Sequence, residues 1–484
     1  MLTRDEFQKL YEQGPDAVWS AFARLQETLV AQQQQIDTLL VQVKELQDRL
    51  GKDSHHSHKP PSSDGLKKKP VSLRQQTGRK PGGQKGHPGR TLEFAEEPDH
   101  ILVHSPSCCE GCGTDLAGVA GKTGERRQVF DLPLLGLEVT EHRSEQKACP
   151  NCGKCCQGSF PQEATSLVQY GPRVKGLGLY LLDFQLLPYQ RIADLFADLF
   201  DAPLSPGMLH KAQQNASERL APVVEKIREA LTQAPAAHFD ETGFRIIGRL
   251  HWLHSASTAL LSYYTWHPKR GKIGMDAAGV LPSFGGRAVH DGYASYQQYP
   301  CRHALCNVHH LRELTALFEN EGALWARDMR HLLVEMKQAV DRARAQGRTR
   351  LSVLEEAAFE GRYQKLLKQG LAANPPPVVR EGKRGRPKQT VARNLLLRLQ
   401  DHREQVLAFL YDFAVPFDNN QAERDVRMMK VQQKISGCFR STEGADAFCR
   451  IRSYICTLRK QGKQILSALE HVFRGDLIYP EFTG

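Results

Sequence analysis

The sequence lacks any apolar run that approaches the roughly 20 residues of a membrane-spanning helix. Its N-terminus, "MLTRDEFQKLYEQG", also lacks the apolar core of a signal peptide. Acidic residues are in deficit, because 54 Asp and Glu stand against 65 Lys and Arg, which gives a formal net charge of +11. We therefore expect no membrane partner, a cytoplasmic location and a polyanionic partner. At 484 residues the chain can form about three or four domains.

Residues 16–50 carry a helical pattern with a seven-residue repeat, within an N-terminal coiled-coil region that we assign to residues 1–51. Its two seams are Phe22, Leu29, Ile36, Val43 and Leu50, and Leu25, Gln32, Leu39 and Leu46. An apolar residue every 3.5 positions is typical of a coiled coil, and a polar residue such as Gln32 sets register. We predict a helix that joins copies of the chain into a homo-oligomer. The alternative is an amphipathic helix packed on its own domain.

Residues 52–95 have almost nothing to bury and form a basic linker. Ten Lys and Arg and only two Asp occur between residues 51 and 90. The stretch "GRKPGGQKGHPGR" resembles an AT-hook, in which basic residues around Pro-Gly lie in a narrow minor groove, and "REGKRGRPKQT" (380–390) resembles a second one. The alternative is a solvated basic segment. The candidate DNA-binding residues are Arg79, Lys80, Lys85, Arg90, Arg384 and Arg386.

Residues 96–160 hold seven of the twelve cysteines. Two Cys-x-x-Cys pairs, Cys109/Cys112 and Cys149/Cys152, each supply half of a tetrahedral Zn²⁺ site. The segment between them alternates like a hairpin, so we predict a zinc ribbon. Four protein ligands leave no open position, which makes this zinc structural. Three nearby cysteines remain alternative ligands: Cys108, Cys155 and Cys156.

Residues 161–234 have the pattern of helices. "YQRIADLFADLF" is followed by a short turn and a long helix, for which Ser205 is the expected N-cap and Pro206 the first residue. A helix, a short turn and a polar second helix indicate a helix-turn-helix that binds DNA. Any two packed helices give a similar pattern.

Residues 235–315 have the pattern of strands. We predict a three-stranded meander that carries Asp240 on its first strand, a fourth strand that ends at Asp291, and a fifth that enters a helix. This is the strand order of a ribonuclease H-like fold, which brings the ends of its first and fourth strands together. In "CNVHH", Cys306 and His309 keep a Cys-x-x-His spacing, and we interpret them as a buried cysteine and a hydrogen-bonded histidine.

Residues 316–412 are helical and form an insertion, and residues 413–484 complete the same domain. A helix should begin near Asn419 or Asn420, which can cap it. Glu423, Arg427 and Lys430 then share one face, with the carboxylate toward a metal and the basic groups toward DNA. The alternative is a surface ion pair between Glu423 and Arg427. A last helix is expected to pack in the core through Phe448, Ile451, Ile455 and Leu458.

Asp240, Asp291 and Glu423 are the candidate catalytic residues. Two aspartates at strand ends and a glutamate on a helix suit a pair of Mg²⁺ (or Mn²⁺) ions, which prefer hard oxygen ligands. The fold class that follows is multidomain α+β. It combines an N-terminal coiled coil, a zinc ribbon-like domain, a helical domain and a ribonuclease H-like α/β catalytic domain with a helical insertion.

Five ordered motifs resemble the DDE transposases of the insertion-sequence sixty-six group. They are "KPPSSDGL" (59–66), "GRKPGGQKGHPG" (78–89), the paired cysteine knuckles, "HFDETG" (238–243) and "DNNQAER" (418–424). The resemblance implies 3′ strand cleavage at the ends of an insertion sequence and strand transfer into target DNA. It implies Asp240, Asp291 and Glu423 as the triad, and DNA and accessory proteins of the same element as partners. Location at the nucleoid would follow.

Two other functions fit the same residues. One is a sequence-specific DNA-binding regulator with an inactive catalytic core, and the other is a metal-dependent DNA nuclease without strand transfer. End-specific strand joining distinguishes a transposase from both.

Overall fold

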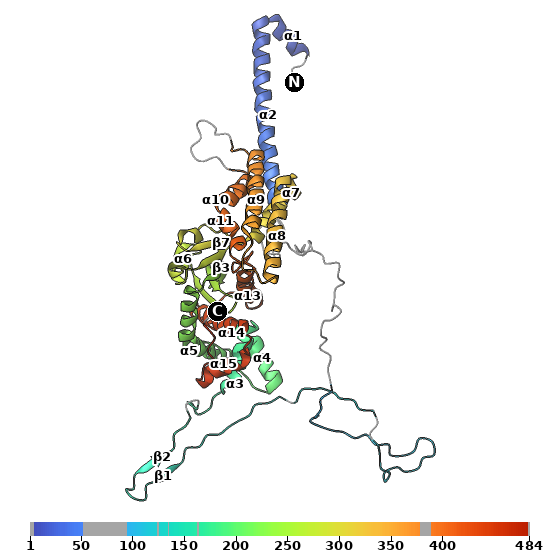
Figure 1. Cartoon of the computed structure of the whole chain (residues 1–484), viewed down its shortest axis with the longest axis vertical. Helices are drawn as coiled ribbons and strands as arrows, with labels where there is room; N and C mark the ends of the chain where they lie inside the picture. The colour runs from blue at the N-terminus through green and yellow to red at the C-terminus, as the bar shows by residue number, and fades with distance from the viewer. Residues whose placement is uncertain are drawn as a thin grey trace.

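The computed structural model describes most of the chain and divides it into a long N-terminal helix, an extended segment and a compact α+β body (Figure 1). No helix in the described residues is long and apolar enough to cross a membrane. The AT-hook-like candidates lie outside the described residues. Those residues are 4–51, 94–122, 125–133, 135–161, 164–377 and 389–482.

The N-terminal region is helical, as the heptad pattern predicts. Helix α1 (Arg4–Glu12) is followed by α2 (Pro15–Gly51), which projects from the rest of the chain in Figure 1. The seam residues whose exposure is described are all about half exposed. They are Phe22 at 52%, Leu25 at 50%, Leu29 at 56%, Ile36 at 49%, Leu39 at 52% and Val43 at 48%.

The cysteine-rich segment differs from the expected ribbon. The described part of the stretch between the two knuckles contains no strand up to β1 (Gln146–Ala148), so the predicted hairpin there is wrong. Instead, β1 pairs antiparallel with β2 (Cys155–Gln157) and encloses the second knuckle. Apolar side chains in the stretch remain exposed, Val129 at 90% and Val139 at 89%, so nothing buries one face of a hairpin there.

The helical region 172–232 shares its core with the sheet that follows. Ser205 accepts a hydrogen bond from Met208 N at 3.1 Å and Pro206 starts α5, which confirms the predicted start of that helix. Helix α5 packs against α14 and buries its apolar face beside the sheet. The elements are α3 (Pro172–Leu179), a π-helical turn (Tyr180–Phe184), α4 (Tyr189–Phe200) and α5 (Pro206–Thr232).

Five strands form one mixed sheet in the order β5-β4-β3-β6-β7. The first three form the predicted antiparallel meander, and β3 then pairs parallel with β6, which pairs parallel with β7. Helix α6 (Lys272–Ala277) lies in the connection between β5 and β6. The strands are β3 (Ala236–Ile246), β4 (Arg249–Ser257), β5 (Ser262–His267), β6 (Arg287–His290) and β7 (Arg302–Leu305).

Side chains along β3 point alternately to the two faces of the sheet, which pack against different helices. Ala237 and Phe239 join the core beneath α5, whereas Phe244 and Ile246 pack with the residues of α13 and α14. Since neighbouring side chains point to opposite faces, Asp240 lies on the same face as Phe244. That face is the one that α13 covers.

The predicted helical insertion has a hydrophobic core of its own. Apolar residues from Leu305 to Phe417 form one buried cluster, and the two ends meet where Asn307 N–H donates to Phe417 O at 3.1 Å. The insertion can therefore fold without separating the strands from the last part of the domain. Its helices are α7 (Asn307–Glu321), α8 (Leu324–Ala345), α9 (Val353–Ala373), α10 (Val391–Asp401), α11 (Arg403–Val406) and α12 (Ala408–Tyr411).

Three helices complete the body: α13 (Asn420–Ser436), α14 (Thr442–Lys460) and α15 (Ile465–Arg474). The four apolar residues predicted to pack on α14 are all buried. Hydroxyl groups of α14 also join it to the sheet edge, because Ser453 Oγ accepts from Tyr264 N at 2.9 Å. Thr457 Oγ1 likewise accepts from Ser262 N at 3.0 Å.

Gly286 permits the close approach that starts β6. A Cβ there would lie 2.3 Å from Ala234 O and 2.8 Å from Pro235 O, whereas a Cβ on Gly285 would meet nothing within 4 Å. Overpacking of this kind costs about 1–3 kcal/mol. We expect Gly286→Ala to lower the free energy of unfolding by that amount in urea titrations, and Gly285→Ala to lower it far less. Equal losses for the two variants would contradict this account.

Candidate active site

Two aspartates lie level with each other on adjacent parallel strands. The register of β3 on β6 pairs His238 with Val289, so two residues further along Asp240 lies beside Asp291. Neighbouring strands are about 4.8 Å apart. The structure thus brings these two predicted site residues together.

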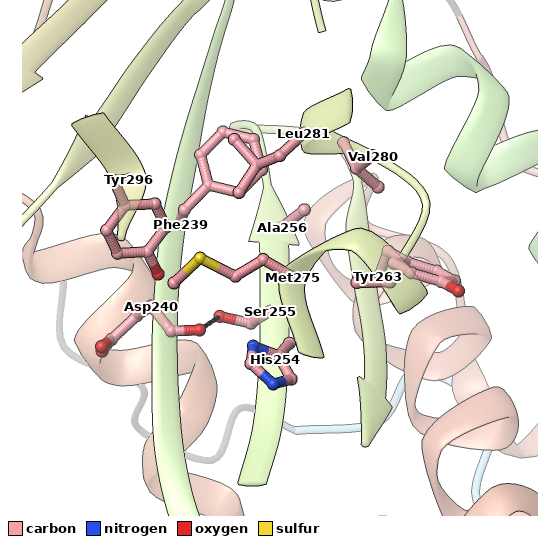
Figure 2. Close-up of a pocket in the computed structure, with 11 residues that line it drawn as sticks. Phe239, Asp240, His254, Ser255, Ala256, Tyr263, Met275, Val280, Leu281 and Tyr296 are labelled. Atoms are coloured by element: carbon pink, nitrogen blue, oxygen red, sulfur yellow. Dashed lines mark hydrogen bonds between the residues drawn. The ribbon is translucent and has the colours of Figure 1, made fainter. Parts of the chain in front are cut away.

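Asp240 is held by its own strand and by β4. Its Oδ1 accepts from Glu241 N at 2.8 Å, and its carbonyl accepts from Ser255 Oγ at 3.1 Å. Figure 2 shows this second bond beside a pocket that also borders Phe239 and Tyr296. The cavity measures about 20 Å³, which is room for a water molecule and not for a nucleotide. This cavity is therefore too small to be a nucleotide-binding pocket.

Asp291 sits in a turn that fixes its direction. Its Oδ1 accepts from Tyr293 N at 2.9 Å, and Gly292 adopts a φ of +91°, which few other residues tolerate. Gly292 N–H donates to His290 Nδ1 at 3.0 Å, so the hydrogen of His290 lies on Nε2 and points to His303 Nδ1, also at 3.0 Å. Burial, followed by the charge of His303, lowers the pKa of His290 to about 3 and keeps it neutral.

Glu423 reaches the site through Asn419. The buried amide of Asn419 donates to Phe239 O at 2.9 Å, and its Oδ1 lies 2.8 Å from His238 Nδ1. Its backbone N–H donates to Cys306 Sγ at 3.2 Å. Because α13 starts at the next residue, these contacts fix Glu423, one turn later, over the strand that carries Asp240.

The capping prediction for α13 was right in position and wrong in mechanism. Asn419 is the N-cap residue, but its side chain makes no cap bond, because it is bound to β3. The nearby backbone donor of Asn420 is satisfied instead by Asp418 Oδ1 at 3.0 Å. Sequence spacing showed an asparagine suited to a cap but could not show its partner across the fold.

The charges of neighbouring carboxylates act on Asp240 and on Glu423. Burial first, then the charges of Glu241 and Asp291, and to a smaller extent Glu423, raise the pKa of Asp240 well above its ordinary value. Burial also raises the pKa of Glu423, opposed by the charge of Arg312. A cluster of this kind is unfavourable while fully charged and is stabilised by a divalent cation.

A fourth acidic residue near the site, Glu241, was not among the predicted site residues. It faces away from Asp240 along the strand and is fully buried, where Tyr296 Oη donates to it at 2.5 Å and Arg270 Nε at 2.8 Å. The Arg270 guanidinium also lies 4.1 Å from the ring centroid of Tyr293. Burial and Asp291 raise the pKa of Glu241, while these two donors lower it. Glu241 thus anchors the loop after β5 next to the aspartates.

The two described basic candidates on α13 behave differently. Arg427 is exposed one turn after Glu423 and lowers the pKa of Glu423 by its charge. Lys430 instead donates to the carbonyl of Gly243 on β3. Among the ion pairs of the described residues, Glu423 contacts His309 and not Arg427, so the surface-pair alternative does not describe this glutamate.

Both cysteine knuckles adopt one local geometry. In the first, Cys109 N–H donates to Thr114 O at 2.9 Å and Gly113 N–H donates back to Cys109 O at 2.8 Å. The second, around Cys149 and Cys152, repeats both bonds at 2.9 Å. Each loop turns through a glycine with positive φ. This arrangement presents both thiols of a pair on one side, as a metal knuckle requires.

Hydrogen bonds favour thiolates in the knuckles. The Thr114 hydroxyl lowers the pKa of Cys112, and a backbone bond from Cys152 lowers that of Cys149. Within the described residues, however, the two pairs do not come within metal-binding distance of each other. Each Cys-x-x-Cys pair is suited to bind zinc, but the described residues do not bring the two pairs together into one four-cysteine site.

The comparisons with known proteins agree with this description. Residues 168–447 match the Transposase IS66 family, and residues 106–153 match the zinc-finger binding domain of transposase IS66. Residues 14–93 match a family of unknown function (DUF6444). No curated protein matches the chain significantly.

The two IS66 matches support a transposase or DNA-binding role. Since the first match covers more than half of the 484 residues, the chain belongs to the IS66 transposase family. Structural zinc in the segment 106–153 follows from the second match.

Proposed function

We propose that this chain is a DDE transposase that binds the ends of its insertion sequence, cleaves the 3′ strand and transfers it into target DNA. The observation that carries the proposal is the convergence of Asp240, Asp291 and Glu423 from β3, β6 and α13 onto one face of the sheet. The strand order β5-β4-β3-β6-β7 further supports a ribonuclease H-like catalytic domain.

The residues present fit a pair of Mg²⁺ (or Mn²⁺) ions. Asp240 and Asp291 lie side by side at β3 and β6, and the charge of Glu423 raises the pKa of Asp240, so the three offer an all-oxygen donor set of the kind that these hard cations prefer. Among the described residues, the three carboxylates do not all lie within 4.8 Å of one another. When bound, such ions supply activation of the attacking oxygen and neutralisation of the leaving one. Asp240, Asp291 and Glu423 would hold them.

The remaining residues bind and orient. Arg427 is exposed on the same face of α13 as Glu423 and is placed to contact a DNA phosphate beside the carboxylates. Asn419 and Glu241 act on the site from behind, because they fix α13 and the loop after β5 against β3. Such an enzyme needs access to chromosomal DNA, so we expect it in the cytoplasm at the nucleoid.

The triad is tested by cleavage of a labelled element-end duplex with Mg²⁺ or Mn²⁺. We expect Asp240→Asn, Asp291→Asn and Glu423→Gln each to bind the duplex and to cut at least about 100-fold more slowly, since even outer-shell partners of metal ligands cost about 10–100-fold. Asp425→Asn is the matched control, because that carboxylate lies on the same helix and pairs with Lys460.

Three results would contradict the proposal. Cutting by Glu423→Gln at the control rate would move the third ligand elsewhere. Cutting without joining of the freed 3′ end to a target duplex would favour the nuclease. Metal-independent binding of element ends by a wild-type chain that never cuts, with the other proteins of the element present, would favour the regulator.

We propose that Cys109, Cys112, Cys149 and Cys152 hold the structural zinc. The matched segment 106–153 contains all four and ends before the alternatives Cys155 and Cys156. Cys112→Ser and Cys149→Ser should each lower bound zinc by about one ion per chain in elemental analysis. Cys438→Ser, which removes an exposed cysteine elsewhere, is the control. The same loss in Cys155→Ser would reassign a ligand.

We propose that the half-exposed seam of α2 joins copies of the chain. Ile36→Asp places an unpaired charge in that seam and should shift the full-length protein to smaller assemblies in light scattering. Gln34→Asp places the same charge outside the two seams and should leave the assembly unchanged. An unchanged mass for Ile36→Asp would show that α2 packs on its own chain.

A further inference from the structure

The first turn of α7 is fastened to both sides of the active site. Cys306, its N-cap residue, donates through its N–H to His290 O at 2.9 Å, directly before Asp291. On the other side, Cys306 Sγ accepts from Asn419 N at 3.2 Å. A side chain on this turn is therefore fixed relative to both Asp291 and α13.

His309 projects from that turn toward Glu423. Its Nε2 lies 3.4 Å from Glu423 Oε1, and its side chain is 9% exposed while that of Glu423 is 27% exposed. A carboxylate at the start of a helix has several rotamers, and only some of them direct an oxygen toward Asp240. A buried neighbour that binds one oxygen limits that choice.

We propose that His309 is a positioning residue, which binds one oxygen of Glu423 and leaves the other directed at the metal site shared with Asp240 and Asp291. This inference rests on the proposed function, because it takes Glu423 as a metal ligand. Hydrogen bonds of this type are often long before substrate and metal bind, and shorten afterwards, which suits a separation of 3.4 Å.

A different role for the same residues is a soft-metal site. Cys306, His309 and Glu423 present ligand atoms within 4.8 Å of one another. The thiol of Cys306, however, is 1% exposed and already accepts the N–H of Asn419, and no fourth ligand completes the group among the described residues. Zinc would also take the carboxylate away from the aspartates. The geometry therefore favours the positioning role.

The test measures cleavage as a function of Mg²⁺ concentration for His309→Ala and His309→Gln. Loss of a partner that orients a metal ligand costs about 10–100-fold in metal affinity. The Mg²⁺ concentration for half-maximal cleavage should rise by that factor in His309→Ala and by less in His309→Gln, which keeps a donor. Saturating Mg²⁺ should restore most of the rate.

His310→Gln is the matched control. His310 lies on the same turn and is equally buried, but its Nδ1 pairs with Asn307 Oδ1 at 3.2 Å rather than with Glu423. The His310→Gln variant should leave the Mg²⁺ concentration for half-maximal cleavage (the Mg²⁺ midpoint) unchanged. The Mg²⁺-induced rise in Tm gives a second readout that needs no cleavage, and it should be smaller in both His309 variants than in the control.

Distinct results overturn this inference and the proposed function. An unchanged Mg²⁺ midpoint in His309→Ala, with Glu423→Gln inactive, would remove the role of His309 and leave the triad intact. Normal cutting by Glu423→Gln would remove the third ligand itself. A thiolate–cobalt absorption band that is present in the Co²⁺-loaded wild-type chain and lost in Cys306→Ser would make His309 a metal ligand instead.

Discussion

One buried amide connects the three parts of the chain that supply the candidate active site. Asn419 binds the backbone of β3 through its side chain and the thiol at the start of α7 through its N–H, and α13 begins at the next residue. A buried amide left without these partners costs about 1–3 kcal/mol for each lost bond. The position of Glu423 over Asp240 thus depends on hydrogen bonds made four residues earlier, and not on contacts of the glutamate alone.

The elements that follow from local pattern were predictable. Alternation and turn residues indicated β3 to β7, and Ser205 with Pro206 located the start of α5. Contacts between distant segments could not be predicted. An asparagine that caps a helix and an asparagine that binds a distant strand look the same in sequence. The hairpin expected between the knuckles failed for a related reason, since alternation predicts a strand only where something covers its apolar face.

In the candidate site, too, the sequence predicted the individual residues but not the contacts between them. Asp240, Asp291 and Glu423 were identified by residue type and position, and the register of β3 on β6 brings the aspartates level. The residues that surround them escaped sequence reasoning. Glu241, next to Asp240 in the sequence, is turned to the opposite face, where it accepts hydrogen bonds from Arg270 and Tyr296. The Cys-x-x-His spacing pointed to His309, but only the folded structure places its Nε2 3.4 Å from Glu423 Oε1.

The meeting of the two ends of the helical insertion has a consequence for how the protein is made. Asn307 and Phe417 are joined by a backbone hydrogen bond across more than one hundred intervening residues. Asp240 and Asp291 leave the ribosome before the insertion and Glu423 are synthesised. A chain interrupted within the insertion would lack Glu423 and also α13, α14 and α15, whose apolar residues complete the core around the sheet. The strands that carry the two aspartates can therefore pack fully only after the last part of the chain has been synthesised.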